Sequence, residues 1–222
     1  MIFSADSGTS PARLTTKPKK YTLCGVRITI FWLLASLLFA SVTRAQAPAE
    51  VPVFAISAAE SSIKFNVKAS MAIEGRFDRW DASLRFASRH VTTGVLNIKV
   101  YADSVDTGSG IKNNTLKGKD FFDVRQNPLI TFNSTKLVQT GPDTFEVDGD
   151  FTIRGVTKRE RLTLTVFGKG TGSGEIKGTM AFDRKNYGMN SNIPFIRIAN
   201  RVEVIVNLKV KRVSGPPPIF TQ

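Results

Sequence analysis

The stretch Phe145-Glu-Val-Asp-Gly-Asp-Phe-Thr-Ile153 decides the fold, because its apolar and polar side chains alternate. A two-residue period is typical of a β-strand with one buried face, since successive side chains of a strand point to opposite sides. Its acidic residues also suggest a calcium loop, but the remaining ligand spacing and the terminal glutamate are missing. The stretch therefore predicts a half-buried strand whose outer face carries Glu146, Asp148 and Asp150.

The same alternation recurs along most of the chain from residue 53 onward. It is found in residues 62–68, 80–86, 96–100, 130–132, 162–166, 176–182 and 202–208. Turn residues separate these segments, as in Gly141-Pro-Asp143 and the glycine-rich run 168–174. Short alternating strands joined by such turns are typical of sandwiches and closed barrels. We therefore expect one all-β domain, an extended antiparallel barrel of about eight strands.

Residues 109–123 interrupt this strand pattern. They lack alternation and predict a short helical segment, with Ile111, Leu116, Phe121 and Phe122 on its apolar side. Pro128 then restarts an extended strand at its first position, where a missing N–H costs little. We expect this segment to form a lid across one end of the barrel.

The N-terminal residues 1–45 have the order of a secretory signal. Basic residues precede the uncharged run 28–42, and small residues follow it, with expected cleavage after Ala45. The run is shorter than the roughly 20 residues that span a membrane, although a retained anchor stays as the alternative. We expect a periplasmic or secreted protein with a lead-in at 46–52, a barrel domain at 53–213 and a loose Pro-rich tail at 214–222.

Charge and composition limit the function classes. Removing residues 1–45 takes six of 31 basic and one of 18 acidic residues, which leaves 25 against 17 and a net charge of +8. Cys24, the only cysteine, lies in the segment that cleavage removes. His90, the only histidine, lies in a predicted turn. No activated serine motif is present. We therefore expect no enzyme, no catalytic residue, no metal and no cofactor. The cations alternate with Thr, Asn and Ser rather than aromatics, which argues against nucleic acid as a partner.

Seven motifs in register resemble the YceI-like family of periplasmic polyisoprenoid-binding proteins. They are Ser62-Ile-Lys-Phe-Asn-Val67, Gly75-Arg-Phe77, Val105-Asp-Thr-Gly108, Lys119-Asp-Phe-Phe-Asp-Val124, Asn127-Pro-Leu-Ile-Thr-Phe-x-Ser134, Val147-x-Gly-Asp-Phe-Thr-Ile-Arg-Gly-Val-Thr-Lys158 and Asp183-Arg-Lys-Asn-Tyr-Gly188. The resemblance implies a lipocalin-like barrel, an exported location and an isoprenoid-like lipid in the pore. Many relatives carry histidines where this chain has Lys68-Ala-Ser-Met71 and Asn113-Asn-Thr-Leu116. That departure argues against redox or quinone chemistry here.

The inward apolar side chains are the candidate ligand contacts. They are Phe65, Val67, Phe77, Trp80, Leu84, Phe86, Leu96, Ile98, Leu116, Phe121, Phe122, Ile130, Phe132, Val147, Phe151 and Phe182. Lys117, Lys119 and Arg184 are candidates for a polar or phosphorylated head group, although Arg184 also suits a structural ion pair. The expected partner is a polyisoprenoid or similar amphipathic lipid. Transient contact with a membrane surface and formation of a homodimer are further interactions compatible with the sequence. The alternative is a ligand-free envelope interaction or stress-related structural module, in which the same side chains fill the core.

Overall fold

The computed structural model describes residues 50–70, 72–190 and 198–221 of the 222-residue chain. The expected signal segment 1–45 and most of the expected lead-in lie outside the described residues. The described part is one antiparallel sheet with short helical turns and one α-helix. Among these residues, no helix is both long and apolar enough to cross a membrane.

Ten strands make up the sheet. They are β1 (Val53–Ala69), β2 (Ile73–Phe77), β3 (Trp80–Phe86), β4 (Gly94–Tyr101), β5 (Val105–Asp106), β6 (Leu129–Gln139), β7 (Thr144–Ile153), β8 (Val156–Phe167), β9 (Ser173–Asp183) and β10 (Ile198–Ser214). The helix α2 spans Gly110–Lys117, and the 3-10 turns are η1 (Val91–Thr93), η2 (Ala102–Ser104) and η3 (Arg184–Tyr187). The strand order is β3-β4-β6-β7-β8-β9-β10-β1-β2-β5.

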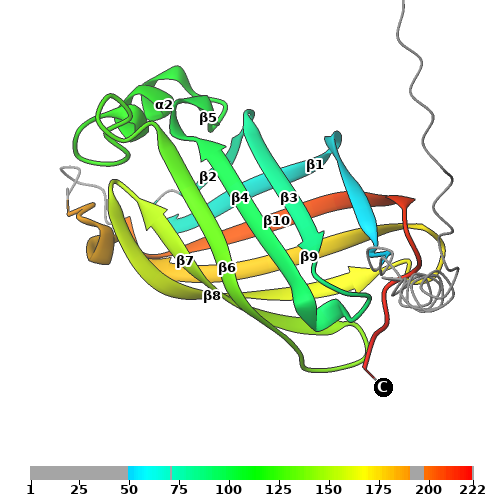
Figure 1. Ribbon diagram of the computed structural model, residues 1–222. Helices are drawn as coiled ribbons and strands as arrows, with labels where there is room; N and C mark the ends of the chain where they lie inside the picture. Colours follow the sequence, from blue (N-terminus) through cyan, green and yellow to red (C-terminus); the bar gives the residue numbers. More distant parts are fainter. Residues whose placement is uncertain (1–49, 71, 191–197, 222) are drawn as a thin grey trace, which may run out of the picture. The chain divides into compact units, whose positions relative to one another are not determined.

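The sheet curls round until its edge strand β3 approaches β1. Figure 1 shows β3, β4 and β6 crossing in front of β1, β9 and β10. Phe54 of β1 and Phe86 of β3 pack with ring centroids 5.9 Å apart. No hydrogen-bonded ladder joins these two strands in the described ranges, so side chains close the barrel along this seam. The predicted antiparallel barrel is confirmed.

The sheet has ten strands rather than about eight because β2 and β5 join it at one edge. β5 holds only two residues, which is too short for a readable alternation. β2 contains Gly75, whose missing side chain interrupts the pattern; a methyl group there would collide with the ring of Phe65. Phe65 and Gly75 are cross-strand partners, so the Phe65 ring packs over the glycine in the space that a side chain would occupy.

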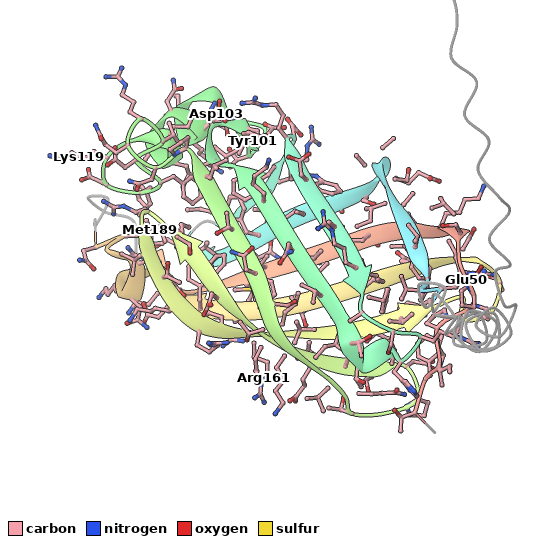
Figure 2. The ribbon with its side chains drawn as sticks, viewed as in Figure 1. Glu50, Tyr101, Asp103, Lys119, Arg161 and Met189 are labelled. Atoms are coloured by element: carbon pink, nitrogen blue, oxygen red, sulfur yellow. The ribbon has the colours of Figure 1, made fainter. Side chains whose placement is uncertain are left out.

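The deciding stretch 145–153 forms β7 with its apolar side chains buried, as the alternation predicts. Its outer carboxylates pair with arginines of β8, of which Figure 2 shows Arg161 on the outer side of the barrel. Arg161 lies 2.8 Å from a carboxylate oxygen of Glu146 and 2.8 Å from one of Asp148, and Arg159 pairs with Asp150 at 3.4 Å. The hydrogen bond from Arg161 holds the pKa of Asp148 below its usual value. These carboxylates therefore neutralise neighbouring cations on a solvated face.

The two ends of the barrel are closed differently (Figure 1). The predicted helical segment is confirmed as α2, which lies with η3 at one end of the barrel. The C-terminal tail lies at the opposite end. We refer to residues 109–127 as the lid and to residues 215–221 as the tail.

The tail, which the sequence predicts to be loose, makes hydrogen bonds to the barrel through its described residues. The backbone of Ile219 exchanges hydrogen bonds with the strand-end loop, donating to Arg89 O at 2.7 Å and accepting from Val91 N at 3.0 Å. The Gln139 side chain donates to Thr221 O at 2.8 Å and accepts from Thr221 N at 2.7 Å. The prolines of the tail have no N–H group and cannot continue a strand. The N–H groups of Ile219 and Thr221 bond instead to the loop after β3 and to Gln139.

Candidate functional site

In the part of the chain that the structure describes, two almost wholly apolar cavities lie inside the barrel. The lid chamber holds about 90 Å³ and the tail chamber about 80 Å³. The lid chamber is lined by Ile63, Phe65, Val67, Ile73, Phe77, Ile98, Val100, Leu116, Phe121, Phe122, Ile130, Thr131, Phe132, Phe151, Ile153, Leu162, Met180, Phe182, Arg184, Met189, Ile198, Val202, Val204 and Val206. The tail chamber is lined by Phe54, Leu84, Phe86, Val91, Leu96, Leu137, Phe145, Leu164, Val166, Ile176, Val210, Pro218 and Phe220.

An aromatic cluster joins the lid to the barrel wall. The ring of Phe122 lies 5.8 Å from that of Phe77 and 6.4 Å from that of Phe65, and the two strand residues lie 5.6 Å apart. These distances fall within the 4.5–7 Å range in which aromatic pairs attract one another. Phe122 therefore closes the lid chamber by packing on rings that belong to the sheet.

The chain of the lid folds back on α2 through backbone hydrogen bonds. Phe122 N donates to Leu116 O at 2.9 Å, and Asp123 N donates to Gly118 O at 2.9 Å. Asp123 has a φ of 48°, which turns the chain sharply after the two phenylalanines. As a result Leu116, Phe121 and Phe122 all point into the chamber although only Leu116 belongs to the helix.

Polar contacts anchor the start of the lid to β5. Asn113 on α2 accepts a hydrogen bond from Thr107 N at 2.8 Å and donates to Asp106 at 3.3 Å. Asp106 also accepts from Gly108 N at 2.9 Å and pairs with Arg76 at 3.0 Å. The bond from Gly108, followed by that from Asn113, lowers the pKa of Asp106. This network fixes where α2 begins.

Arg154 ties the lid to the loop after η3. It lies in the turn between β7 and β8, and it donates through Nη2 to Lys119 O at 3.0 Å and through Nη1 to Gly188 O. Its φ of 54° is uncommon for a non-glycine residue. The side chain thereby bridges two segments that both border the lid chamber.

Arg184 is the buried cation of the lid chamber. Its side chain is 3% exposed and donates through Nε to Ala199 O at 3.2 Å and through Nη1 to Met189 O. Lys117 and Lys119 belong to the lid and do not line the chamber; Figure 2 places Lys119 on the outer side of the lid.

Tyr187, the last residue of η3, fills this end of the barrel. The residue is fully buried, and its ring packs 5.5 Å from Phe151 and 5.2 Å from Phe182. Its hydroxyl donates to Glu160 at 2.8 Å. Burial, followed by the hydrogen bond to Glu160, raises the pKa of Tyr187 far above its ordinary value. Tyr187 therefore stays neutral and closes this end of the barrel with a satisfied polar group.

The lid chamber has few groups capable of chemistry. Thr131 and Arg184 are the polar side chains in its lining, and neither is a cysteine, histidine or carboxylate. Within the described ranges, no three His, Cys, Asp or Glu side chains gather as a metal site would require. His90 is exposed and forms an isolated parallel bridge with Ile219 of the tail. The geometry is that of an apolar binding site.

Comparison with known proteins agrees with this architecture. A family model described as the YceI-like domain matches residues 54–210. The chain belongs to the YceI-like family. Among curated relatives, a UPF0312 protein of Pseudomonas aeruginosa (strain LESB58) is 31% identical and one of Yersinia pestis (strain Pestoides F) is 33% identical, each over 96 residues, or 43% of this chain and 50% of the relative. The aligned part of the YceI-like chain spans about half the length of these relatives.

Solved structures share the fold of this YceI-like chain at low sequence identity. Burkholderia cenocepacia BcnA matches with a TM-score of 0.64 and 22% identity, covering 70% of this chain and 99% of BcnA. A polyisoprenoid binding domain from Saccharophagus degradans, implicated in plant cell wall breakdown, matches with a TM-score of 0.59 and 14% identity, covering 72% and 99%. A Campylobacter jejuni YCEI protein matches with a TM-score of 0.55 and 19% identity, covering 64% and 86%.

The candidate residues of this YceI-like domain divide between the two chambers. The lid chamber brings together Phe65, Val67, Phe77, Ile98, Leu116, Phe121, Phe122, Ile130, Phe132, Phe151, Phe182 and Arg184. Leu84, Phe86 and Leu96 line the tail chamber instead. Trp80 and Val147 line neither: Trp80 packs against the core from the edge strand β3, and Val147 is fully buried between the chambers.

Sequence reasoning missed several lining residues of the YceI-like barrel. Met180 and Val204 lie in the predicted alternating runs 176–182 and 202–208, so they were assigned to the interior but not to the ligand contacts. Met189 and Ile198 lie outside any alternating run, and only the fold brings them to the chamber. Pro218 and Phe220 were placed in a tail without structure, and they line the tail chamber.

Proposed function

We propose that this protein binds a long apolar, isoprenoid-like lipid in its barrel, for carriage, storage or sequestration outside the cytoplasm. One observation carries the proposal: an interior chamber lined by apolar side chains from strands on both sides of the barrel and closed by an apolar lid. The family resemblance and the Saccharophagus degradans domain described as polyisoprenoid-binding support the same ligand class. The lining offers no nucleophile or base in a catalytic arrangement, which favours binding over catalysis.

The energetics favour a chain-like ligand. Each methylene group removed from water contributes about 0.8 kcal/mol before the costs of ordering are subtracted. An apolar cavity of about 150 Å³ accommodates a benzene-sized molecule, and the lid chamber measures about 90 Å³. A long chain therefore enters only if side chains move aside. Met180 and Met189 in the wall have flexible side chains suited to this.

Export is part of the proposal and rests on residues 1–45. Their basic stretch, apolar run and small-residue end are typical of a signal segment. Osmotic release of the protein from native cells, with a mature N-terminus near Gln46, is the expected result. Recovery in the cytoplasm with residues 1–45 intact would contradict export. The net charge of +8 after cleavage also favours transient contact with anionic membrane surfaces.

The ligand is tested by extraction of the protein purified from its native host. We expect mass spectrometry of an organic extract to show an apolar molecule at about one per chain. Val100→Phe places a larger side chain in the lid chamber and should reduce that yield. Val95→Phe makes the same change on the same strand at a side chain that is 42% exposed, and it should leave the yield unchanged. A wild-type extract without any apolar molecule would overturn the proposal.

The second candidate is a ligand-free module that contacts an envelope partner. The small volumes of the two chambers favour it, because side chains fill most of the interior. The same extraction separates the candidates, since a ligand-free module yields no apolar molecule. A homodimer is compatible with either function, and light scattering of the purified protein measures it directly.

A further inference from the structure

The two chambers are successive parts of one interior. They share strands, and their lining residues follow one another at inward positions along each strand. On β4, Ile98 lines the lid chamber and Leu96 the tail chamber; on β8, Leu162 and Leu164 divide in the same way. The chambers are thus separated by side chains alone, because no backbone element crosses the interior at this level in the part of the chain that the structure describes.

The separating level, which we call the waist, consists of Val147, Gly178 and Leu208. Gly178 and Leu208 are inward positions flanked by a lid-chamber residue on one side and a tail-chamber residue on the other. On β7, Val147 follows Phe145 of the tail chamber, and Gly149 comes between it and Phe151 of the lid chamber. None of the three waist residues lines either chamber. Val147 and Leu208 are 0% exposed.

Gly178 lets neighbouring leucines complete the waist. A Cβ atom on Gly178 would lie 2.8 Å from Leu164 Cδ2 and 3.2 Å from Leu162 Cδ1. Both contacts are too close for ordinary packing, so the two leucine side chains occupy the space that the glycine leaves open. The interior is therefore filled at this level from β7, β8 and β10 together.

We propose that the waist ends the lid chamber and limits the length of the apolar chain that it accepts. This inference rests on the proposed function and adds selection by chain length. β7 is paired on both sides, with β6 and β8, and β10 is paired with β9 and β1. The waist therefore belongs to the hydrogen-bonded wall of the barrel, whereas the lid lies outside the sheet.

The strand geometry gives the length of the lid chamber, and apolar chains longer than this chamber should bind more weakly. Lining residues of β10 run from Ile198 to Val206. At about 3.3 Å per residue and a tilt of about 40°, this segment spans roughly 20 Å along the barrel. Continuing to Val210 in the tail chamber adds roughly 10 Å by the same geometry. Opening the waist should therefore extend the accepted chain by about half of its original length.

The test compares binding of geraniol, farnesol, geranylgeraniol and solanesol, four prenyl alcohols of increasing length, by displacement of a fluorescent apolar probe. For the wild type we expect solanesol to bind about tenfold or more weakly than farnesol. Leu208→Ala opens the waist and should remove that difference. Val147→Ala also opens the waist but removes a smaller side chain, and it replaces Leu208→Ala in the test if that variant does not fold. Val210→Ala enlarges the tail chamber below the waist, and it should keep the wild-type order.

The outcomes separate this inference from the proposed function. Equal wild-type affinity for all four alcohols overturns the length limit alone, since the protein then binds lipid without selecting its length. A length limit that both waist variants retain also overturns the assignment to the waist. Binding of none of the alcohols by the folded wild type overturns the length limit together with isoprenoid binding.

Discussion

Removal of the Arg154 side chain should loosen the lid without unfolding the barrel. Arg154 donates one hydrogen bond to Lys119 O in the lid and one to Gly188 O beyond η3. We choose Arg154→Gly, because glycine accepts the φ of 54° at this position more readily than other residues. The substitution therefore removes the two hydrogen bonds and also removes the backbone strain of a non-glycine residue at this φ.

The magnitude follows from those two bonds. A hydrogen bond that involves a charged group contributes about 1.5–3 kcal/mol, and solvent exposure of the Arg154 side chain reduces each of the two bonds to about 1 kcal/mol, or about 2 kcal/mol in total. Since 1.4 kcal/mol corresponds to a factor of ten, the open lid should become about 30-fold more populated.

Native-state hydrogen exchange measures this opening directly. The amides of Phe122 and Asp123 are bonded within the lid, to Leu116 O and Gly118 O, so their exchange reports lid opening. We expect both to exchange about 30-fold faster in Arg154→Gly. Arg161→Ala provides the matched control, because Arg161 also holds two acceptors but lies on the outer face between β7 and β8.

Unchanged exchange at Phe122 and Asp123 in folded Arg154→Gly would refute the reasoning, because the lid would then be held by its aromatic contacts alone. Equal acceleration of lid and strand amides would also refute it, since that result indicates global destabilisation. Arg154→Ala, which loses the same bonds but keeps the backbone strain, should show the same lid exchange with lower overall stability.

Three further results are expected. Gly75→Ala should lower the free energy of unfolding by about 1–3 kcal/mol in urea titration, because its methyl group overlaps Phe65, and wild-type stability would contradict that packing. The raised pKa of Tyr187 contributes stability that is complete below its ordinary value of 10.0 and is lost as pH rises through the folded value. Thermal melts should show this alkaline loss in the wild type and less of it in Tyr187→Phe, and identical profiles would exclude Tyr187 as the cause. Phe220→Ala should uncover the tail chamber and increase fluorescence of an apolar dye, and unchanged emission would indicate that Phe220 does not close it.

The strands and the lid could be predicted because their signals are local. In residues 145–153 the alternation of apolar and polar neighbours shows which side chains face the interior, and the structure buries the apolar ones as expected. The helical segment was recognisable because alternation stops there and Leu116, Phe121 and Phe122 remain apolar. In both cases a window of about ten residues contains the whole physical argument.

The parts that escaped prediction depend on contacts between distant residues. The docked tail relies on Gln139 and Thr221, which are 82 positions apart. Leu96 and Ile98 have the same sequence pattern yet line different chambers, because the waist between them is set by residues on other strands. Alternation identifies which side chains face inward, and it carries no information on how far along the barrel each one lies.

The pairing of β1 with β10 has a consequence for how the protein is made. Val67 pairs with Val202 and Val53 with Ser214, and the hydrogen bond from Lys209 N to Ser61 Oγ joins residues 148 positions apart. A ribosome must therefore have synthesised the chain through β10 before this ladder can form. Such a high contact order slows folding, because loop closure has to precede the favourable contacts. Until then β1 keeps an unpaired edge, which exposes the nascent chain to aggregation or to capture by a chaperone.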